Sequence, residues 1–220
     1  MITNNNRDVF ESIAKEYIRE DSHWGSDLDL IKVTLDELVR GEKNPKWLDI
    51  GCGPGFHISN IGELYPEVRA TGIDYSPSMI REAQERIKKL GKLGLRNIIL
   101  KEMDVIEEFP EGKYHLVTFL NNGFGNLYRN RTDPKEVRRS VIRGIFRSLA
   151  RGGYFVLSVY NREMIDANYG NNLAPVPDLS DLKRGDLFVE YHPKGNGKVL
   201  YFSHWFSEKE LCELAEETGL

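Results

Sequence analysis

A glycine-rich turn between a short apolar segment and an amphipathic one constrains this chain more than any other feature. Residues 47–50 are apolar except for Asp49, and Gly51, Gly53 and Gly55 follow at alternate positions. A short apolar run that ends in glycines is typical of a buried strand. Glycine lets the backbone turn sharply and approach a ligand, and the free N–H groups of a following helix point at the same place. The pattern predicts a strand, a ligand-binding turn and a helix in that order.

Strand-like and helix-like segments alternate around this turn. Apolar residues at intervals of three and four predict helices over residues 8–19 and 27–39, before the first strand. The further expected strands are 68–73, 97–101, 114–119 and 154–160, and the expected helices are 56–65, 77–90 and 134–149. Little or no helix fits between the strands at 97 and 114. This alternation predicts an α/β fold, a Rossmann-like doubly wound and mostly parallel sheet with helices on both faces.

The C-terminal part has a different character. Residues 166–186 are rich in Asn, Asp, Gly and Pro, which indicates a long loop of the kind that often forms a lid. Residues 187–192 and 199–206 alternate in polarity and predict an antiparallel hairpin near the C-terminus. Ser207 and Glu210 predict a capping box for a last helix that ends at Gly219.

Length and composition favour a single domain. With 220 residues, 40% of them hydrophobic and 29% charged, the chain can bury one full core. We expect N-terminal cap helices over 1–42, a ligand-binding core over 43–160, and a lid loop, hairpin and last helix over 161–220, all within one domain over 1–220. No apolar run approaches the length of a membrane span or a secretory signal, which predicts a cytoplasmic protein without a membrane partner.

Charge and cysteine content predict neither nucleic acid nor metal as a partner. The formal net charge is −4, whereas nucleic-acid phosphates favour a basic surface. Arg139, Arg143 and Arg147 repeat at helical spacing beside Arg138 and Arg151, and we interpret them as a solvated helix face rather than an RNA site. The two cysteines are far apart and match no metal-ligand spacing, so they are expected to be reduced thiols. The oligomeric state is not indicated.

A second acidic residue strengthens the case for a nucleoside ligand. Asp74 ends the second expected strand, and a carboxylate there can accept both hydroxyls of a ribose. Ser76 and Pro77 then fit the cap and first residue of the next helix. A nicotinamide-dependent oxidoreductase is the alternative within this fold, but its fingerprint keeps two residues between the second and third glycines. Here one residue separates them, and Phe56 occupies the place of the third glycine.

Taken in order, these motifs resemble those of the class I S-adenosylmethionine-dependent methyltransferases, in particular the members that act on small molecules. The resemblance is carried by DIGCGPG at 49–55, GIDYSPSMI at 72–80 and MDV at 103–105, and FESIAKEY at 10–17 is similar to the N-terminal helix of many members. It covers about residues 8–160. It implies S-adenosylmethionine as cofactor and methyl transfer by in-line displacement.

The resemblance also implies roles for individual residues. The glycines would line the methionine and ribose part, with Asp49 directed at the methionine amino group. Asp74 would hold the ribose, Met79 would pack on adenine, and Asp104 with Val105 would read the adenine amino edge. The implied cofactor-binding set is Asp49, Gly51, Gly53, Gly55, Asp74, Tyr75, Met79, Asp104, Val105 and Asn121. Met79 fits plain helix core equally well.

The methyl acceptor and any catalytic base are less well indicated. Residues 121–128 resemble the loop that carries an Asn, a Gly and an aromatic toward the acceptor in glycine- and sarcosine-type N-methyltransferases, although the order of residues differs. This favours a small-molecule substrate, with an amine as one hypothesis. Methylation of tRNA or protein, or a non-catalytic cofactor-binding partner subunit, are the alternatives. The candidate catalytic residues are Tyr17, Asn122, Tyr128 and His204, with His57, Asn126 and Tyr160 also expected near the rim.

The end of the sequence raises one structural expectation. Members of this family place a long antiparallel strand in the sheet after the helix that here ends at Gly219, and the sequence stops at Leu220. Either the hairpin takes the place of that strand or the sequence is truncated. Truncation is favoured, because loss of the strand would leave Val159 and Phe202 poorly covered and the sheet edge open.

Overall fold

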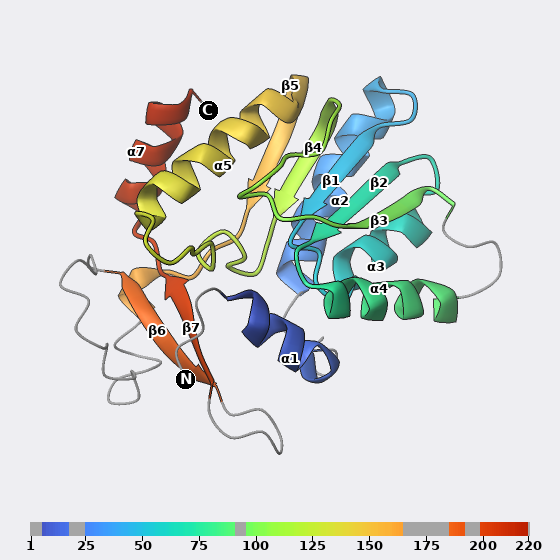
Figure 1. Cartoon of the computed structure of the whole chain (residues 1–220). Coiled ribbons are helices and arrows are strands. Elements are labelled where there is room, and N and C mark those ends of the chain that lie inside the picture. Colours follow the sequence, from blue (N-terminus) through green and yellow to red (C-terminus); the bar gives the residue numbers. More distant parts are fainter. Residues whose placement is uncertain (1–5, 18–24, 91–95, 165–184, 192–198, 220) are drawn as a thin grey trace.

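A five-stranded parallel sheet forms the centre of the protein (Figure 1). The computed structural model describes residues 6–17, 25–90, 96–164, 185–191 and 199–219. The strands are β1 (Lys46–Ile50), β2 (Arg69–Asp74), β3 (Ile98–Glu102), β4 (Tyr114–Phe119) and β5 (Leu149–Leu157). Their order is β3-β2-β1-β4-β5, so the chain winds outward from β1 in both directions. The doubly wound sheet predicted from the sequence is confirmed.

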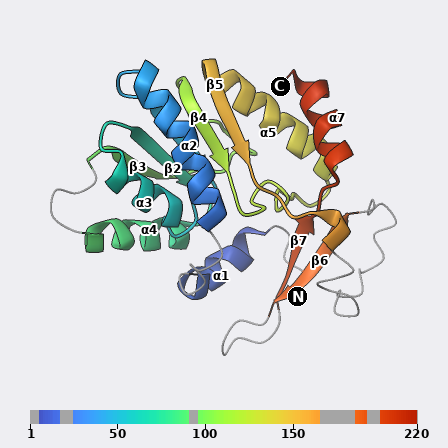
Figure 2. The same ribbon diagram turned by 180° about the vertical axis from the view of Figure 1, so that it is seen from behind.

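Helices cover both faces of the sheet (Figures 1 and 2). They are α1 (Arg7–Tyr17), α2 (Gly25–Gly41), α3 (Phe56–Leu64), α4 (Pro77–Leu90), α5 (Pro134–Ser148) and α7 (Glu208–Thr218). One core joins α2 and α3 to the sheet through residues such as Ile31, Ile61 and Trp47, and the other joins α5 and α7 to the opposite face through Ile142 and Leu214. Burial of both faces accounts for the continuous apolar character of the central strands.

Most expected element boundaries agree with the structure, and β5 is the exception. It begins at Leu149, immediately after α5, rather than at residue 154. The first residue pairs with Tyr114, and the register then shifts before Leu116 pairs with Tyr154. Gly152 has a φ of 73° within this irregular stretch, a conformation that glycine adopts without strain. The interval between β3 and β4 contains turns and no helix, as expected.

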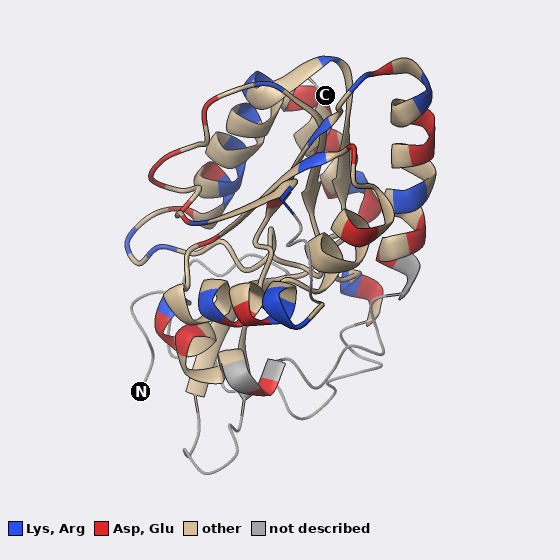
Figure 3. Cartoon of the chain, turned by 90° about the vertical axis from the view of Figure 1, so that its right-hand side faces the viewer, with Lys and Arg blue, Asp and Glu red and all other residues tan. Residues whose placement is uncertain are grey.

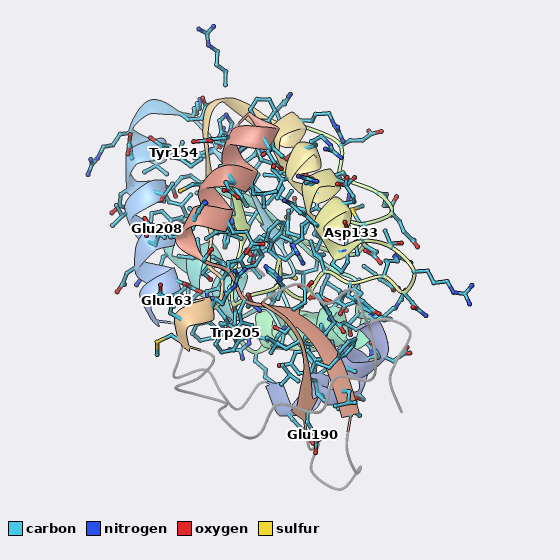
Figure 4. The ribbon with its side chains drawn as sticks, turned by 90° about the vertical axis from the view of Figure 1, so that its left-hand side faces the viewer. Asp133, Tyr154, Glu163, Glu190, Trp205 and Glu208 are labelled. Atoms are coloured by element: carbon cyan, nitrogen blue, oxygen red, sulfur yellow. The ribbon has the colours of Figure 1, made fainter. Side chains whose placement is uncertain are left out.

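The helix starts follow the capping signals in the sequence. Ser76 accepts a hydrogen bond from the Met79 amide, which confirms it as the cap of α4. Asp133 accepts from the Lys135 amide at the start of α5, and Ser207 accepts from the Glu210 amide at the start of α7, next to Glu208 (Figure 4). The capping-box interpretation of Glu210 is wrong in one respect. Its carboxylate binds His204 and Arg162 instead of turning back to the helix start.

The C-terminal hairpin forms a sheet of its own. Its strands are β6 (Asp186–Tyr191) and β7 (Val199–His204), antiparallel as expected. They are not paired with the main sheet, so the hairpin does not take the place of a further strand, and β5 is an edge of the described sheet. The expectation that Phe202 would be poorly covered is wrong, because its side chain is fully buried between Phe188 and Tyr128. Most of the expected lid loop over 166–186 lies outside the described residues.

A buried polar cluster fastens the hairpin to α5 and α7. His204 Nδ1 contacts Asp186 and its Nε2 lies 2.9 Å from Glu210 Oε1. Arg138 Nη2 lies 3.9 Å from Asp186 Oδ1, and its guanidinium lies 5.6 Å from the centre of the Phe206 ring. Arg138 is only 3% exposed, so it does not belong to the solvated arginine face expected for α5. In this cluster cationic and anionic groups compensate one another where water is excluded.

Helix α1 lies across the edge of the sheet where the parallel strands end (Figure 1). At its start, the buried Asn6 amide donates 2.7 Å hydrogen bonds to the carbonyls of Asn126 and Phe202, and its oxygen accepts from the Phe202 amide. One side chain therefore joins the N-terminus, the loop after β4 and the hairpin.

The contact between the hairpin and the loop after β4 has no room for a side chain at Gly125. A Cβ there would collide with the His204 carbonyl oxygen and lie 2.5 Å from Asn122 Oδ1. Gly125→Ala should lower the free energy of unfolding by about 1–3 kcal/mol, measured by urea unfolding. Gly41→Ala, where the added Cβ meets nothing within 4 Å, is the control and should leave stability unchanged or slightly raised. Equal losses in the two variants would contradict this account.

Candidate functional site: a cavity at the carboxyl edge of the sheet

The main cavity lies where the strand order reverses, at the carboxyl ends of β1, β2 and β4. Open α/β sheets bind ligands at this position, because the loops after adjacent strands diverge to opposite faces. The space at this edge, counted together with its open mouth and the adjoining solvent, amounts to about 1080 Å³. Among the described residues, the lining includes Asn6, Arg7, Phe10, Asp49, Gly51, Gly53, His57, Asp74, Tyr75, Met79, Asp104, Val105, Asn121, Asn126, Leu127, Tyr128 and Arg129.

The glycine turn after β1 has the conformation that the sequence pattern requires. Gly51, Gly53 and Gly55 all have positive φ, at 64°, 52° and 79°. Gly51 and Gly53 line the cavity. Gly55 does not, because it lies against α4, where a Cβ would be 2.8 Å from the Cβ of Ala83. The three glycines therefore have two roles. Gly51 and Gly53 leave room beside the cavity, and Gly55 permits close packing of the turn on α4.

Asp74 connects the end of β2 to this turn. Its Oδ2 accepts a 3.0 Å hydrogen bond from the Gly53 amide, and its Oδ1 accepts one of 2.9 Å from the Ser76 amide. The side chain is 6% exposed. Burial raises the pKa of Asp74 to about 6 even though the two amide hydrogen bonds oppose the shift. Each oxygen keeps capacity for a further donor, as two ribose hydroxyls would require.

Asp49 is held at the cavity wall by a chain of buried hydrogen bonds. The Trp47 indole donates to Thr118 Oγ1 over 2.9 Å, and the Thr118 hydroxyl donates to Asp49 Oδ1 over 2.7 Å. The other oxygen of Asp49 is buried and accepts no hydrogen bond within the described chain. Burial raises the pKa of Asp49 to about 7, and the nearby charges of Asp74 and Asp27 add to the shift. A buried acceptor without a donor is costly, so this oxygen points to a ligand that donates.

The cavity wall includes the three residues expected around adenine, together with Tyr75 of the expected cofactor-binding set. Tyr75, Met79, Asp104 and Val105 all line the cavity. The Asp104 carboxylate accepts from the Ile106 amide through one oxygen and from Arg129 over 2.8 Å through the other. Met79 is 2% exposed and also packs against α1, so it belongs both to the core and to the cavity wall.

The loop after β4 brings some of its expected residues to the cavity and not others. Asn121 and Tyr128 line it, as does Asn126. The Tyr128 ring stacks on Phe202 of the hairpin at 4.7 Å between ring centres. Asn122 is fully buried outside the lining, where it donates to Ser203 Oγ and accepts from the Tyr160 amide. It anchors the hairpin and is not placed to meet a substrate.

The remaining catalytic candidates differ in position. His204 lies in the buried cluster of the hairpin, away from the cavity lining, which agrees with a hydrogen-bonded sheet histidine. His57 lines the cavity, and burial lowers its pKa to about 4, so the imidazole is neutral near pH 7. Tyr160 is not part of the lining. Tyr17 is the last residue of α1, and its side chain lies outside the described part of the structure.

Several residues of the site could not be found from the sequence pattern. Thr118 and Trp47 looked like strand core, and only the register of β1 against β4 shows that they orient Asp49. Arg129, which binds Asp104, and Asn6, which joins three segments, carry no local motif. Glu11 on α1 lies within the segment at 10–17 that carries the resemblance, but the pattern gave it no role.

Comparisons with known proteins agree with the fold. A model of the methyltransferase domain family matches residues 48–155. A demethylmenaquinone methyltransferase of Listeria welshimeri is 32% identical over 149 residues, which cover 66% of this chain and 58% of that protein. A tRNA (guanine-N(7)-)-methyltransferase of Streptococcus pneumoniae is 25% identical over 181 residues, 73% of this chain and 81% of that protein. A solved S-adenosylmethionine-dependent methyltransferase of Clostridium acetobutylicum superposes with a TM-score of 0.65 at 17% identity, over 97% and 87% of the two chains.

The fold and the cavity define a Rossmann-like protein with a nucleoside-type site at the carboxyl edge of its sheet. Residues 48–155 belong to the methyltransferase domain family, and the fold is that of solved S-adenosylmethionine-dependent methyltransferases. The nicotinamide-dependent alternative is therefore set aside. The chain spans 58% of the length of the demethylmenaquinone methyltransferase it matches.

The two roles of the glycines can be separated by substitution. Gly55→Ala combines a left-handed backbone with a clash against Ala83 and should cost about 2–4 kcal/mol of stability. Gly53→Ala adds a methyl group to open space, so it should cost only about 1–2 kcal/mol of backbone strain and yet weaken binding of S-adenosylhomocysteine more. Thermal unfolding and calorimetric titration give the two values. The opposite ranking in both measurements would contradict the assignment.

Proposed function

We propose that this protein transfers the methyl group of S-adenosylmethionine to a small-molecule acceptor in the cavity. The observation that carries the proposal is the pair of buried carboxylates, Asp49 and Asp74, at the glycine turn. Asp49 would accept from the methionine ammonium through its unpartnered oxygen, and Asp74 would accept from the ribose hydroxyls. Adenine would be surrounded by Tyr75, Met79, Asp104 and Val105. Gly51 and Gly53 would lie under the ribose and methionine, and Asn121 would approach the methionine. Gly55 would set the shape of the turn.

The charge of the cavity supports a cationic ligand. Two carboxylates are buried at its wall, and Asp27 lies near enough to raise the pKa of Asp49. Burial is the main cause of both raised pKa values, and like charges add to it, from Asp74 and Asp27 at Asp49 and from Glu11 and Asp104 at Asp74. When bound, S-adenosylmethionine supplies a methyl group on a positively charged sulfur. The chain's own residues then need to orient the ligand and exclude water, since positioning alone can contribute about 7 kcal/mol or more to lowering the barrier.

An amine acceptor is supported by the residues on the side of the cavity next to the loop after β4. Asn121, Asn126 and Tyr128 give this side polar groups beside the apolar Leu127. In the transfer, the lone pair of a neutral amine nitrogen would bond to the methyl carbon as the carbon–sulfur bond breaks. S-adenosylhomocysteine would leave with the electron pair of that bond, and the nitrogen would release its proton to water. Burial raises the pKa of Tyr128, so its hydroxyl stays protonated and serves to orient the acceptor rather than to act as a base.

A macromolecular acceptor receives less support. Figure 3 shows the side of the molecule that lies to the right in Figure 1, and the helices there carry positive and negative residues interspersed with one another. On α5, Arg139 forms ion pairs with Glu136 and Glu217, and Arg138 is buried. Fewer arginines of this helix are therefore available to contact nucleic-acid phosphates than its sequence suggested. Within the described residues no helix is long and apolar enough to cross a membrane.

The acceptor class is tested by supplying radiolabelled S-adenosylmethionine together with amines, phenols, carboxylates, quinones, total tRNA or protein. We expect label in the amine fraction and none with Asp74→Ala, which loses the ribose contact. Label in tRNA, in protein or in another small-molecule fraction would overturn the amine assignment. Tight binding of S-adenosylhomocysteine with no transfer to any fraction would favour a non-catalytic partner subunit.

Cofactor binding should depend on pH between 5.5 and 8. The carboxylates bind the ligand in their charged form, and the pKa values of Asp49 and Asp74 are about 7 and 6. Protons therefore compete with the ligand as the pH falls through these values, and affinity is full only above both. The Kd for S-adenosylhomocysteine should rise on the order of 100-fold from pH 8 to pH 5.5.

Calorimetric titration at several pH values measures this dependence directly. Asp49→Asn should bind more weakly at pH 8 and lose the part of the pH dependence near pH 7. His57 has a pKa of about 4 and does not titrate in this range. A Kd that is constant over the range would mean that neither carboxylate contacts the ligand.

A further inference from the structure

The N-terminus of helix α4 is held by a carboxylate from helix α1. Glu11 Oε2 accepts a 2.6 Å hydrogen bond from Ser76 Oγ and one of 2.9 Å from the Ser78 amide. Its Oε1 accepts from the Ser78 hydroxyl and lies 3.2 Å from Arg81 Nη2. Residue 11 is 65 positions away from Ser76, so this contact joins two separate parts of the chain.

This contact is electrostatically strong. The first turn of a helix has free N–H groups and a partial positive charge, and a carboxylate that accepts several hydrogen bonds there is favoured in its charged form. Partial burial alone would raise the pKa of Glu11, but the hydrogen bonds from Ser76 and Ser78 and the charge of Arg81 outweigh it and lower the pKa to about 2. The carboxylate therefore stays charged, and the contact intact, at any physiological pH.

Ser76, two positions after Asp74, connects the Glu11 contact to the carboxylate assigned to the ribose. Ser76 donates its amide to Asp74 Oδ1 and its hydroxyl to Glu11 Oε2. The same serine is therefore bonded both to a carboxylate of the cavity wall and to the helix that crosses the cavity.

Helix α1 itself forms part of the cavity wall. Phe10, next to Glu11, lines the cavity and packs edge-on against Tyr201 of the hairpin at 5.6 Å between ring centres. Asn6 and Arg7 line it as well. Asn6 fixes the start of the helix to β7, whereas Glu11 fixes its middle to α4. A third attachment is apolar, because Val9, Ile13 and Ala14 of α1 pack against Met79 of α4.

We propose that Glu11 is a positioning residue that keeps α1 closed over the bound cofactor by binding Ser76 and Ser78 at the start of α4. The proposal rests on the cofactor site assigned above and not on the identity of the acceptor. Loss of the contact lets α1 open locally, because the rest of the fold does not depend on it. The main effect then falls on the rate at which the cofactor leaves.

The test uses Glu11→Gln in the full chain, with S-adenosylhomocysteine as the probe. Glutamine keeps the size of the side chain but replaces one acceptor oxygen by a donor group that faces the serine donors. We expect Kd to rise about tenfold, which is 1.4 kcal/mol, with most of the change in the dissociation rate. The unfolding midpoint without ligand should shift little, and hydrogen exchange in α1 should become faster.

Matched variants separate this role from a general loss of structure. Asp8→Asn removes a charge from the exposed start of the same helix, away from α4, and should leave Kd and dissociation rate within twofold of the wild type. Arg81→Gln removes an exposed partner of both Glu11 and the Ser78 hydroxyl and should have a similarly small effect. Ser78→Ala should reproduce part of the Glu11→Gln effect, and the double variant should show less than the sum of the two.

The outcomes are distinguishable from failure of the proposed function. A dissociation rate for Glu11→Gln equal to that of the wild type would overturn the positioning role alone. So would a lowered unfolding midpoint with unchanged dissociation. Wild-type protein that does not bind S-adenosylhomocysteine would overturn the cofactor site itself, and the role of Glu11 with it.

Discussion

The parallel pairing of β1 between β2 and β4 is the constraint on which the site depends. Asp49 lies opposite Gly72 on one side and Thr118 on the other, and Asp74 ends the neighbouring strand. Since parallel strands end at the same edge, two carboxylates far apart in the sequence are brought together beside one glycine turn. The chain leaves β1 toward α3 and leaves β4 toward α5, on opposite faces of the sheet, and the space between these two connections becomes the cavity.

The same arrangement creates the electrostatic character of the site. Asp49 and Asp74 are buried where water cannot stabilise their charge, so their pKa values rise toward neutrality. Amide and hydroxyl donors from Gly53, Ser76 and Thr118 offset only part of that cost. The remaining cost can be offset by a ligand that brings positive charge and hydroxyl donors. Cofactor binding in the proposed manner would offset this cost, which is a common relation between stability and function.

The cavity is completed by segments that are not part of the sheet. The hairpin supplies Phe202 behind Tyr128, and α1 supplies Phe10 and the Glu11 contact to α4. The buried side-chain amides of Asn6 and Asn122 hold these segments together. Asn6 is hydrogen-bonded to the backbone of Phe202 in the hairpin, and Asn122 accepts from the amide of Tyr160, which follows β5. These polar contacts fix where the walls of the cavity stand, so they also limit which acceptors fit.

The sequence by itself determined the order of strands and helices, the glycine turn and the two carboxylates at the strand ends, because these follow from local periodicity and from conformations that glycine alone adopts easily. Tertiary structure decided that Gly55 packs on Ala83, that Asn122 and His204 serve the hairpin, that Arg138 is buried, and that Glu11 reaches α4. Each of these depends on contacts between residues that are distant in the chain, and a distance of 196 positions between Asn6 and Phe202 leaves no local pattern to read.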